Sequence, residues 1–202
     1  MKLIGLTGKA GSGKDTLASM ILEHTTGTTR AFADPLRRAA KEIFGLTDQQ
    51  MADRELKEQV VPYWGMSPRR ILQLLGTESV RHVFGGDTWV LNADLRLEAL
   101  LQSESREQLP VEVCIWTDCR YPEEASWIRE NGGIVIRVKR PGVAAVESHS
   151  SEQDLPAELV DGRVINGGTL DELCETVQDI LPDWLDKCVP VHEARKRRDQ
   201  AA

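Results

Sequence analysis

The stretch that decides the fold is Gly8-Lys9-Ala10-Gly11-Ser12-Gly13-Lys14-Asp15-Thr16, which lies between an apolar run at 3–7 and a second apolar segment at 17–22. A short buried strand, a glycine-rich turn and a helix start are, in that order, the parts of a phosphate-binding P-loop. The glycines let successive backbone N–H groups turn towards phosphate oxygens, and the helix N-terminus adds free donors. We therefore predict that residues 9–16 bind a nucleoside triphosphate, with Lys14 reaching its bridging and terminal phosphates. A glycine-rich turn that binds no nucleotide is the alternative.

The P-loop departs from the general pattern directly after its lysine. A serine or threonine hydroxyl usually follows and holds Mg²⁺, whereas here Asp15 follows and Thr16 comes next. Either Thr16 or Asp15 takes that role, directly or through a metal-bound water.

The composition is that of a soluble globular protein. The chain has 202 residues, of which 41% are hydrophobic and 28% charged, enough for one domain with a full core. No run approaches the roughly 18 apolar residues of a membrane span. The first strand begins at once, which leaves no room for a signal peptide. We therefore expect a cytoplasmic protein without a membrane partner.

The net charge and the cysteine spacing limit the kinds of partner and metal site that we expect. The formal net charge is −7, which argues against broad nucleic-acid binding. The basic run Arg195-Lys196-Arg197-Arg198 is interpreted as part of a flexible, solvated tail at 188–202. The four cysteines show no metal-ligand spacing and are expected to be reduced thiols. The sequence does not decide whether the protein forms a homodimer.

Strand and helix patterns alternate along the chain. Strands are expected at 3–7, 28–33, 111–117, 134–140 and in a short run ending at 164–168, with helices between them. This alternation predicts an α/β fold, a mostly parallel five-stranded sheet with helices on both faces. We expect a single domain at 1–187, with a helical insert at 36–103 and a lid-like segment at 140–159.

The helical insert carries candidate acceptor-binding residues. Asp34 and Pro35 follow a strand and open a helix, so Asp34 is expected to cap that helix, to contact a substrate, or both. Arg37 lies one turn further on, either near the same crevice or on a solvated face. Trp89 is expected mainly in the core, with stacking on a substrate base as the alternative.

A second group follows Ser67 and Pro68, which are expected to cap a helix. At helical spacing, one face of this helix presents Arg70, Gln73, Thr77 and Arg81, opposite the apolar Ile71, Leu74 and Leu75. This polar stripe either binds substrate or faces water. Arg69 and Arg70 near the helix start suit a phosphate dianion, because each guanidinium donates two parallel hydrogen bonds.

Three further candidates follow later strands. Asp118 ends the strand at 111–117 and has the place of a carboxylate that orients Mg²⁺, with helix capping as the alternative. Arg140 is the expected base of a lid that neutralises phosphate charge and excludes water. Within that lid, His149 is expected to cap or pack.

These motifs together resemble the phage-type deoxynucleoside monophosphate kinases over most of the chain up to about residue 180. The resemblance rests on the P-loop with its Asp15, on Phe32-Ala33-Asp34-Pro35-Leu36, Pro68-Arg69-Arg70, Gly76-Thr77-Glu78, Gly86-Asp87-Thr88-Trp89-Val90, Asp118-Cys119-Arg120-Tyr121-Pro122-Glu123-Glu124-Ala125, His149-Ser150-Ser151-Glu152 and Ile165-Asn166-Gly167-Gly168. It implies γ-phosphoryl transfer from ATP to a deoxynucleoside 5′-monophosphate with Mg²⁺. It also implies an acceptor held by the insert and an adenine near the loop of Asn166 and Gly167.

From this resemblance and the residues we predict the following roles. Lys14, Arg120 and Arg140 are catalytic, Asp15, Thr16 and Asp118 position Mg²⁺, and the acceptor is bound by Asp34, Arg37, Arg69, Arg70, Gln73 and Trp89. A P-loop kinase of another phosphorylated metabolite, of the dephospho-coenzyme A or phosphomevalonate type, is the alternative enzyme. A nucleotide-dependent nucleic-acid-binding or switch protein is the alternative from another class.

Overall fold

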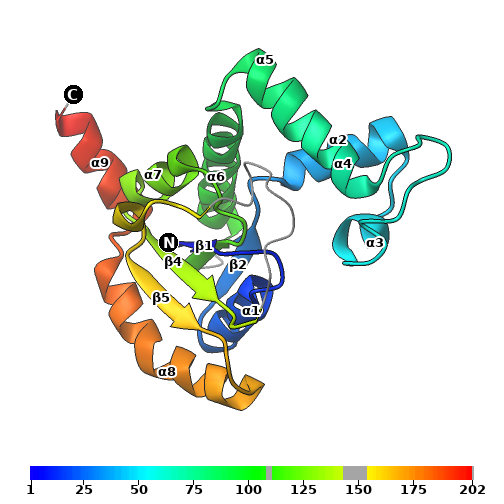
Figure 1. Cartoon of the computed structure of the whole chain (residues 1–202). Coiled ribbons are helices and arrows are strands. Elements are labelled where there is room, and N and C mark those ends of the chain that lie inside the picture. Colours follow the sequence, from blue (N-terminus) through cyan, green and yellow to red (C-terminus); the bar gives the residue numbers. More distant parts are fainter. Residues whose placement is uncertain (108–110, 143–153, 202) are drawn as a thin grey trace. The chain divides into compact units, whose positions relative to one another are not determined.

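A parallel sheet forms the centre of the computed structural model, which describes residues 1–107, 111–142 and 154–201 (Figure 1). Its five strands lie in the order β2-β3-β1-β4-β5, and every neighbouring pair is parallel. The strands are β1 (Lys2–Thr7), β2 (Gly27–Arg30), β3 (Val113–Trp116), β4 (Ile134–Lys139) and β5 (Gly162–Ile165). The predicted α/β class and five-stranded sheet are thus confirmed. The strand expected at 28–33 is shorter than predicted, because β2 ends at Arg30.

The chain divides into two compact units. The first consists of Met1–Ala31 and Arg96–Ala202 and holds the whole sheet, and the second is Phe32–Leu95. The long helix α6 (Thr88–Glu107) contributes its first residues to the second unit and the remainder to the first. These bounds differ from those of the helical insert expected at 36–103, because α6 passes from one unit to the other.

The central strands are apolar because both of their faces are covered. Ile4 and Leu6 of β1 pack into a cluster with α1 (Lys14–His24) and α8 (Leu170–Lys187), through residues that include Leu17 and Val177. Successive strand residues point to opposite faces, so Gly5 faces the other side. A Cβ at Gly5 would lie 3.2 Å from Ile128 of α7 (Pro122–Glu130). Helices therefore cover both faces, as predicted.

The predicted flexible tail at 188–202 is wrong, because the chain continues as helix α9 (Val191–Ala201). Val191 is fully buried, and its N–H donates to the carbonyl of Met1 at 3.0 Å. Arg195 forms an ion pair with Glu98, and its Nε donates to Asn131 Oδ1 at 2.8 Å. The basic run thus includes a residue with specific partners in the fold, which a count of charges cannot reveal.

The second unit is helical around a small apolar core. Ala40, Leu46, Met51 and Ile71 are buried there, and Trp64 packs against them. The helices are α2 (Asp34–Phe44), α3 (Asp48–Ala52), α4 (Pro68–Gln73), the π-helix η1 (Leu74–Arg81), α5 (His82–Phe84) and the start of α6. Gly45 ends α2 with a φ of 64°, a left-handed conformation that glycine adopts easily. In the described part of the chain no helix has both the length and the apolar character to cross a membrane.

We expect Asn131→Ala to lower the free energy of unfolding by about 1–3 kcal/mol, because Asn131 is fully buried and its side chain forms two hydrogen bonds. Its Nδ2 donates to the carbonyl of Trp127 at 2.9 Å, and its Oδ1 accepts from Arg195. Urea unfolding measures the change. The matched control is Arg197→Ala, which removes only an exposed ion pair with Glu193 and should cost less than about 0.5 kcal/mol. Equal effects of the two substitutions would contradict the anchoring role of Asn131.

Candidate functional site

The loop between β1 and α1 is held in a shape that requires glycine at two positions. Gly8 has a φ of 142°, and a Cβ there would lie 2.2 Å from the carbonyl oxygen of Val138. Gly13 has a φ of 96°, and a Cβ there would lie 2.2 Å from Asn166 Nδ2. These two close approaches place the end of β4 and the residue after β5 against the loop. The glycines predicted from the P-loop pattern are therefore demanded by packing as well as by backbone conformation.

Polar groups in this loop are arranged for an anion. Lys14 Nζ donates to the carbonyls of Gly8 at 2.6 Å and Lys9 at 3.0 Å, so its ammonium group lies over the loop. Ser12 is 1% exposed, and its Oγ has no hydrogen-bond partner among the residues that the structure describes. A buried hydroxyl without a partner is costly, and a phosphate oxygen would satisfy it. The residues present therefore fit a bound polyphosphate.

Asn166 joins the end of β5 to the loop. Its Nδ2 donates to the carbonyl of Ser12 at 2.9 Å, and the side chain is buried. The next residues, Gly167 and Gly168, line a pocket of about 340 Å³ together with Thr169 and Glu172 at the start of α8. Asn166, predicted from sequence to bind the cofactor, is thus in direct contact with the P-loop.

A second pocket of about 280 Å³ lies directly beside the loop. Its wall is strongly basic, and the lining residues are Gly8, Lys9, Ser12, Arg137, Val138, Lys139, Arg140, Pro141, Asp154 and Ile165. The predicted lid-base residue Arg140 is therefore placed beside Lys9 and Ser12. The other lid residues named from the sequence, His149-Ser150-Ser151-Glu152, lie outside the described residues.

Sequence reasoning gave no role to Arg137, which lines the same pocket. It is only 6% exposed, on a strand otherwise made of apolar residues up to Lys139. Its guanidinium donates to the carbonyl of Leu155, and its Nε has no partner in the described ranges. A buried guanidinium needs a matching anion or acceptor. The single arginine inside the run Ile134-Val135-Ile136-Arg137-Val138 was the signal that could have identified it.

Asp118 lies at the end of β3, beside the strand that leads into the loop. The N–H of Cys119 donates to the carbonyl of Leu6 at 3.0 Å, which ties the two strand ends together. Asp118 is 6% exposed. Burial, and then the charges of Glu124 and Asp118, raise the pKa of the Cys119 thiol well above its usual range. The thiol therefore stays protonated, and the carboxylate of Asp118 is the oxygen ligand offered at this strand end.

The capping alternative for Asp118 is wrong. Helix α7 begins at Pro122 after the N-cap residue Tyr121. The carboxylate of Glu124 accepts from the backbone N–H groups of Arg120 at 2.7 Å and Tyr121 at 3.1 Å. Arg120 is thus positioned by its backbone between Asp118 and α7.

The start of α1 holds the two other predicted Mg²⁺ residues. Asp15 is exposed, and Thr16 is half-buried, in the first turn of the helix. Asp15 occupies the position directly after Lys14, where a Mg²⁺ ligand of a P-loop usually lies, and Thr16 supplies the hydroxyl one residue further on. Both therefore stay predictions for the metal.

In the second unit, the predicted acceptor-binding arginines are paired with carboxylates. Arg69 forms an ion pair with Glu58, and Arg70 Nη1 lies 2.8 Å from Glu78 Oε1. Ser67 caps α4 by accepting from the N–H of Arg70, as predicted. These pairs hold two guanidinium groups near one helix start.

The prediction that Asp34 caps α2 is wrong, because the N-cap residue is Ala33 and Asp34 is the first residue of the helix. The carboxylate of Asp34 instead lies 3.5 Å from Arg37 Nη1 in an ion pair. Asp34 still lies in the first turn of α2, where a negative charge stabilises the helix dipole.

The polar stripe predicted after Arg70 does not run as one regular α-helix. Residues Leu74–Arg81 form a π-helix, in which the wider turn displaces Thr77 and Arg81 from the spacing that the sequence pattern assumes. Trp89 Nε1 donates to the carbonyl of Gly76 inside this segment at 3.1 Å. Trp89 is half-buried, so its indole supports the π-helix while part of the ring remains exposed. Such segments are frequent at functional sites.

The class of protein follows from the first unit. A parallel sheet in the order β2-β3-β1-β4-β5, with a phosphate-binding glycine loop between β1 and α1, defines a P-loop kinase fold.

Comparison with known proteins gives the family. Residues 54–177 match the sequence profile of the family described as "Deoxynucleotide monophosphate kinase". The chain is 34% identical over 177 residues to the deoxynucleotide monophosphate kinase homologue of Acanthamoeba polyphaga mimivirus, covering 85% of this chain and 92% of that protein. It is 30% identical over 128 residues to the deoxynucleotide monophosphate kinase of Escherichia phage RB69, covering 63% and 49%. It is 26% identical to that of Enterobacteria phage T4, covering 90% and 99%. The chain belongs to the deoxynucleotide monophosphate kinase family.

We expect Asn166→Ala to weaken ATP binding about fivefold, the effect of losing one hydrogen bond of about 1 kcal/mol that holds the P-loop in place. Calorimetric titration with ATP and Mg²⁺ measures the dissociation constant. Asp179→Ala, an exposed position on α8, is the control and should leave binding unchanged. An unchanged dissociation constant in Asn166→Ala would show that the loop does not depend on this contact.

Proposed function

We propose that this protein transfers the γ-phosphoryl group of ATP to the 5′-phosphate of a deoxynucleoside monophosphate, giving the diphosphate and ADP. The observation that carries the proposal is the loop in which Lys14 and the unpartnered hydroxyl of Ser12 converge, on a chain of this family. The relatives from the mimivirus and from phage RB69 are named for the same reaction class.

The donor is held by the first unit. Residues 9–16 bind the phosphates through backbone N–H groups, and Lys14 neutralises their charge. Asn166 and Gly167 lie at the edge of the pocket that would take the adenine. Asp118 would hold Mg²⁺ with Asp15 or Thr16, and the ion would supply charge neutralisation on the phosphates when bound.

The acceptor is held by the second unit in this proposal. Arg69 and Arg70 each carry a planar fork of donors that matches a phosphate dianion, with Asp34, Arg37, Gln73 and Trp89 as further contacts. Their ion pairs with Glu58 and Glu78 keep both guanidinium groups oriented until a dianion replaces the carboxylates. This exchange avoids leaving a charge without a partner.

Catalysis in this proposal consists of positioning and charge stabilisation. The acceptor phosphate is already ionised at neutral pH, so no side chain is needed to remove a proton. In this proposal Arg120 and Arg140 act with Lys14 as catalytic cations, and the buried Arg137 adds a fixed charge in the pocket that Arg140 also lines. Exclusion of water from this pocket would suppress hydrolysis of ATP, the competing reaction.

We expect ADP release with ATP and Mg²⁺ in the presence of at least one of dAMP, dGMP, dCMP and dTMP. Loss of the P-loop charge in Lys14→Ala should lower kcat/KM by at least about 100-fold. The control is Lys187→Ala, an exposed lysine at the end of α8, which should keep full activity. Turnover only with dephospho-coenzyme A or phosphomevalonate would contradict the proposed acceptor, and DNA-stimulated ATP hydrolysis alone would favour a switch protein.

We expect Arg69→Ala to raise KM for the deoxynucleotide about tenfold or more, because it removes charge-assisted hydrogen bonds to the acceptor phosphate. The KM for ATP should stay unchanged. Glu58→Gln is the matched control, since it removes the carboxylate partner of Arg69 and keeps its shape. That variant should bind the acceptor at least as well as the wild type. A rise in KM for ATP alone in Arg69→Ala would contradict the assignment.

A further inference from the structure

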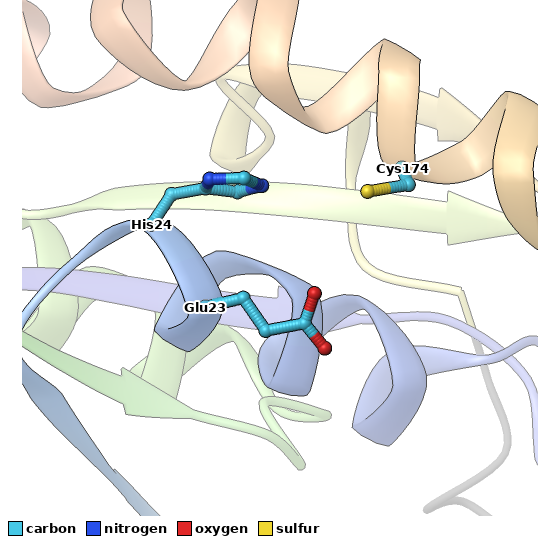
Figure 2. Close-up of side chains that lie close together, drawn as sticks. All are labelled: Glu23, His24 and Cys174. Carbon is cyan, nitrogen blue, oxygen red and sulfur yellow. The ribbon is translucent and has the colours of Figure 1, made fainter.

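Three side chains of the types that bind metals lie close together on the surface of the first unit. None of them lines the pocket of about 280 Å³ beside the P-loop. Glu23 and His24 lie in the last turn of α1, and Cys174 lies on α8 (Figure 2). A carboxylate oxygen, an imidazole nitrogen and the thiol sulfur all lie within 4.8 Å of one another. Cys174 comes about 150 positions after the adjacent Glu23 and His24, so only the packing of α1 against α8 brings the three together.

The spacing of these atoms is close to that of a tetrahedral metal site. Zn²⁺ binds nitrogen and oxygen at about 2.0 Å and sulfur at about 2.3 Å, which places its ligand atoms about 3.3–3.7 Å apart. Glu23 and His24 are exposed and Cys174 is half-buried, so small side-chain rotations close the remaining distance. In Figure 2 the ring of His24 and the sulfur of Cys174 point towards one another.

A glutamine side chain borders the cluster. Gln178, one turn after Cys174 on α8, places its Nε2 at 3.4 Å from His24 Nε2 and at 3.9 Å from Cys174 Sγ. These contacts place a further polar side chain beside the His24 ring and the Cys174 sulfur, a hydrogen-bonding group of the kind that orients metal ligands.

We propose that Glu23, His24 and Cys174 bind one Zn²⁺ ion that links α1 to α8. Binding displaces the thiol proton of Cys174 to solvent, so one thiolate and one carboxylate balance the two charges of the ion. A thiolate and an imidazole favour Zn²⁺ over the Mg²⁺ that phosphoryl transfer uses. A water molecule completes the fourth position.

The other cysteines of the chain are poor competitors for the ion. Cys114, Cys119 and Cys188 are all buried. Burial raises the pKa of Cys188 to about 11, despite the nearby charge of Lys2. The ion is therefore expected at Cys174, where the thiol is accessible and two further ligands are within reach.

The first test is titration of the tag-free full-length protein with Co²⁺, which reports thiolate ligation optically, in the presence of excess Mg²⁺ to occupy the P-loop site. We expect one Co²⁺ per chain with a thiolate-to-metal charge-transfer absorption, displaced by one equivalent of Zn²⁺. Cys174→Ser should abolish this absorption, and His24→Ala should weaken Zn²⁺ binding at least about tenfold. His192→Ala, an exposed histidine on α9, is the control and should bind as the wild type does.

The second test is the rate of alkylation of Cys174 by iodoacetamide, measured by peptide mass spectrometry. Zn²⁺ should protect Cys174, and this protection should be lost in His24→Ala. The proposal is overturned if no ion binds, if Co²⁺ binds without thiolate absorption, or if His24→Ala retains both affinity and protection. Kinase activity with Mg²⁺ should be the same in Cys174→Ser and wild type, so this result is independent of the proposed function.

Discussion

The contact between Asn166 and the P-loop is the constraint on which the site depends. Asn166 Nδ2 donates to the carbonyl of Ser12 and occupies the space that a side chain at Gly13 would need. On the other side of the loop, Gly8 lies against the carbonyl of Val138. The loop is thus held between the ends of β4 and β5, and its N–H groups are fixed before a ligand arrives, which lowers the cost of binding.

The same pocket keeps polar groups that the protein itself does not satisfy. Among the residues described, Ser12 Oγ and Arg137 Nε are buried without a hydrogen-bond partner. Such groups destabilise the fold and persist where a ligand completes them. The predicted acceptor-binding arginines of the second unit do have partners, since Arg69 and Arg70 each form an ion pair with a glutamate. The former arrangement suits a site that polyphosphate oxygens complete each time a nucleotide binds, and the latter suits exchange of a carboxylate for another anion.

Much of the fold follows from local sequence. The apolar strands, the glycine loop, the caps at Ser67 and Thr169 and the helix stop at Gly45 are all visible in the chain, because each depends on neighbouring residues. The predictions that were wrong are of two kinds. Helix α9 is anchored by Asn131 and Glu98, which are distant in the chain. The caps were misassigned over a few residues, since the carboxylate before α7 that accepts backbone N–H groups is Glu124 rather than Asp118, and α2 begins after Ala33.

The sequence by itself determined the class of fold and the phosphate-binding loop, since strand, glycines, lysine and helix are contiguous. Only the tertiary structure decided which distant side chains complete these elements: Arg137 in the pocket wall, Asn166 against the loop and Cys174 beside His24. The physical reason is that periodicity and capping act over a few residues, whereas burial and polar satisfaction depend on segments that meet only when the sheet and its helices pack.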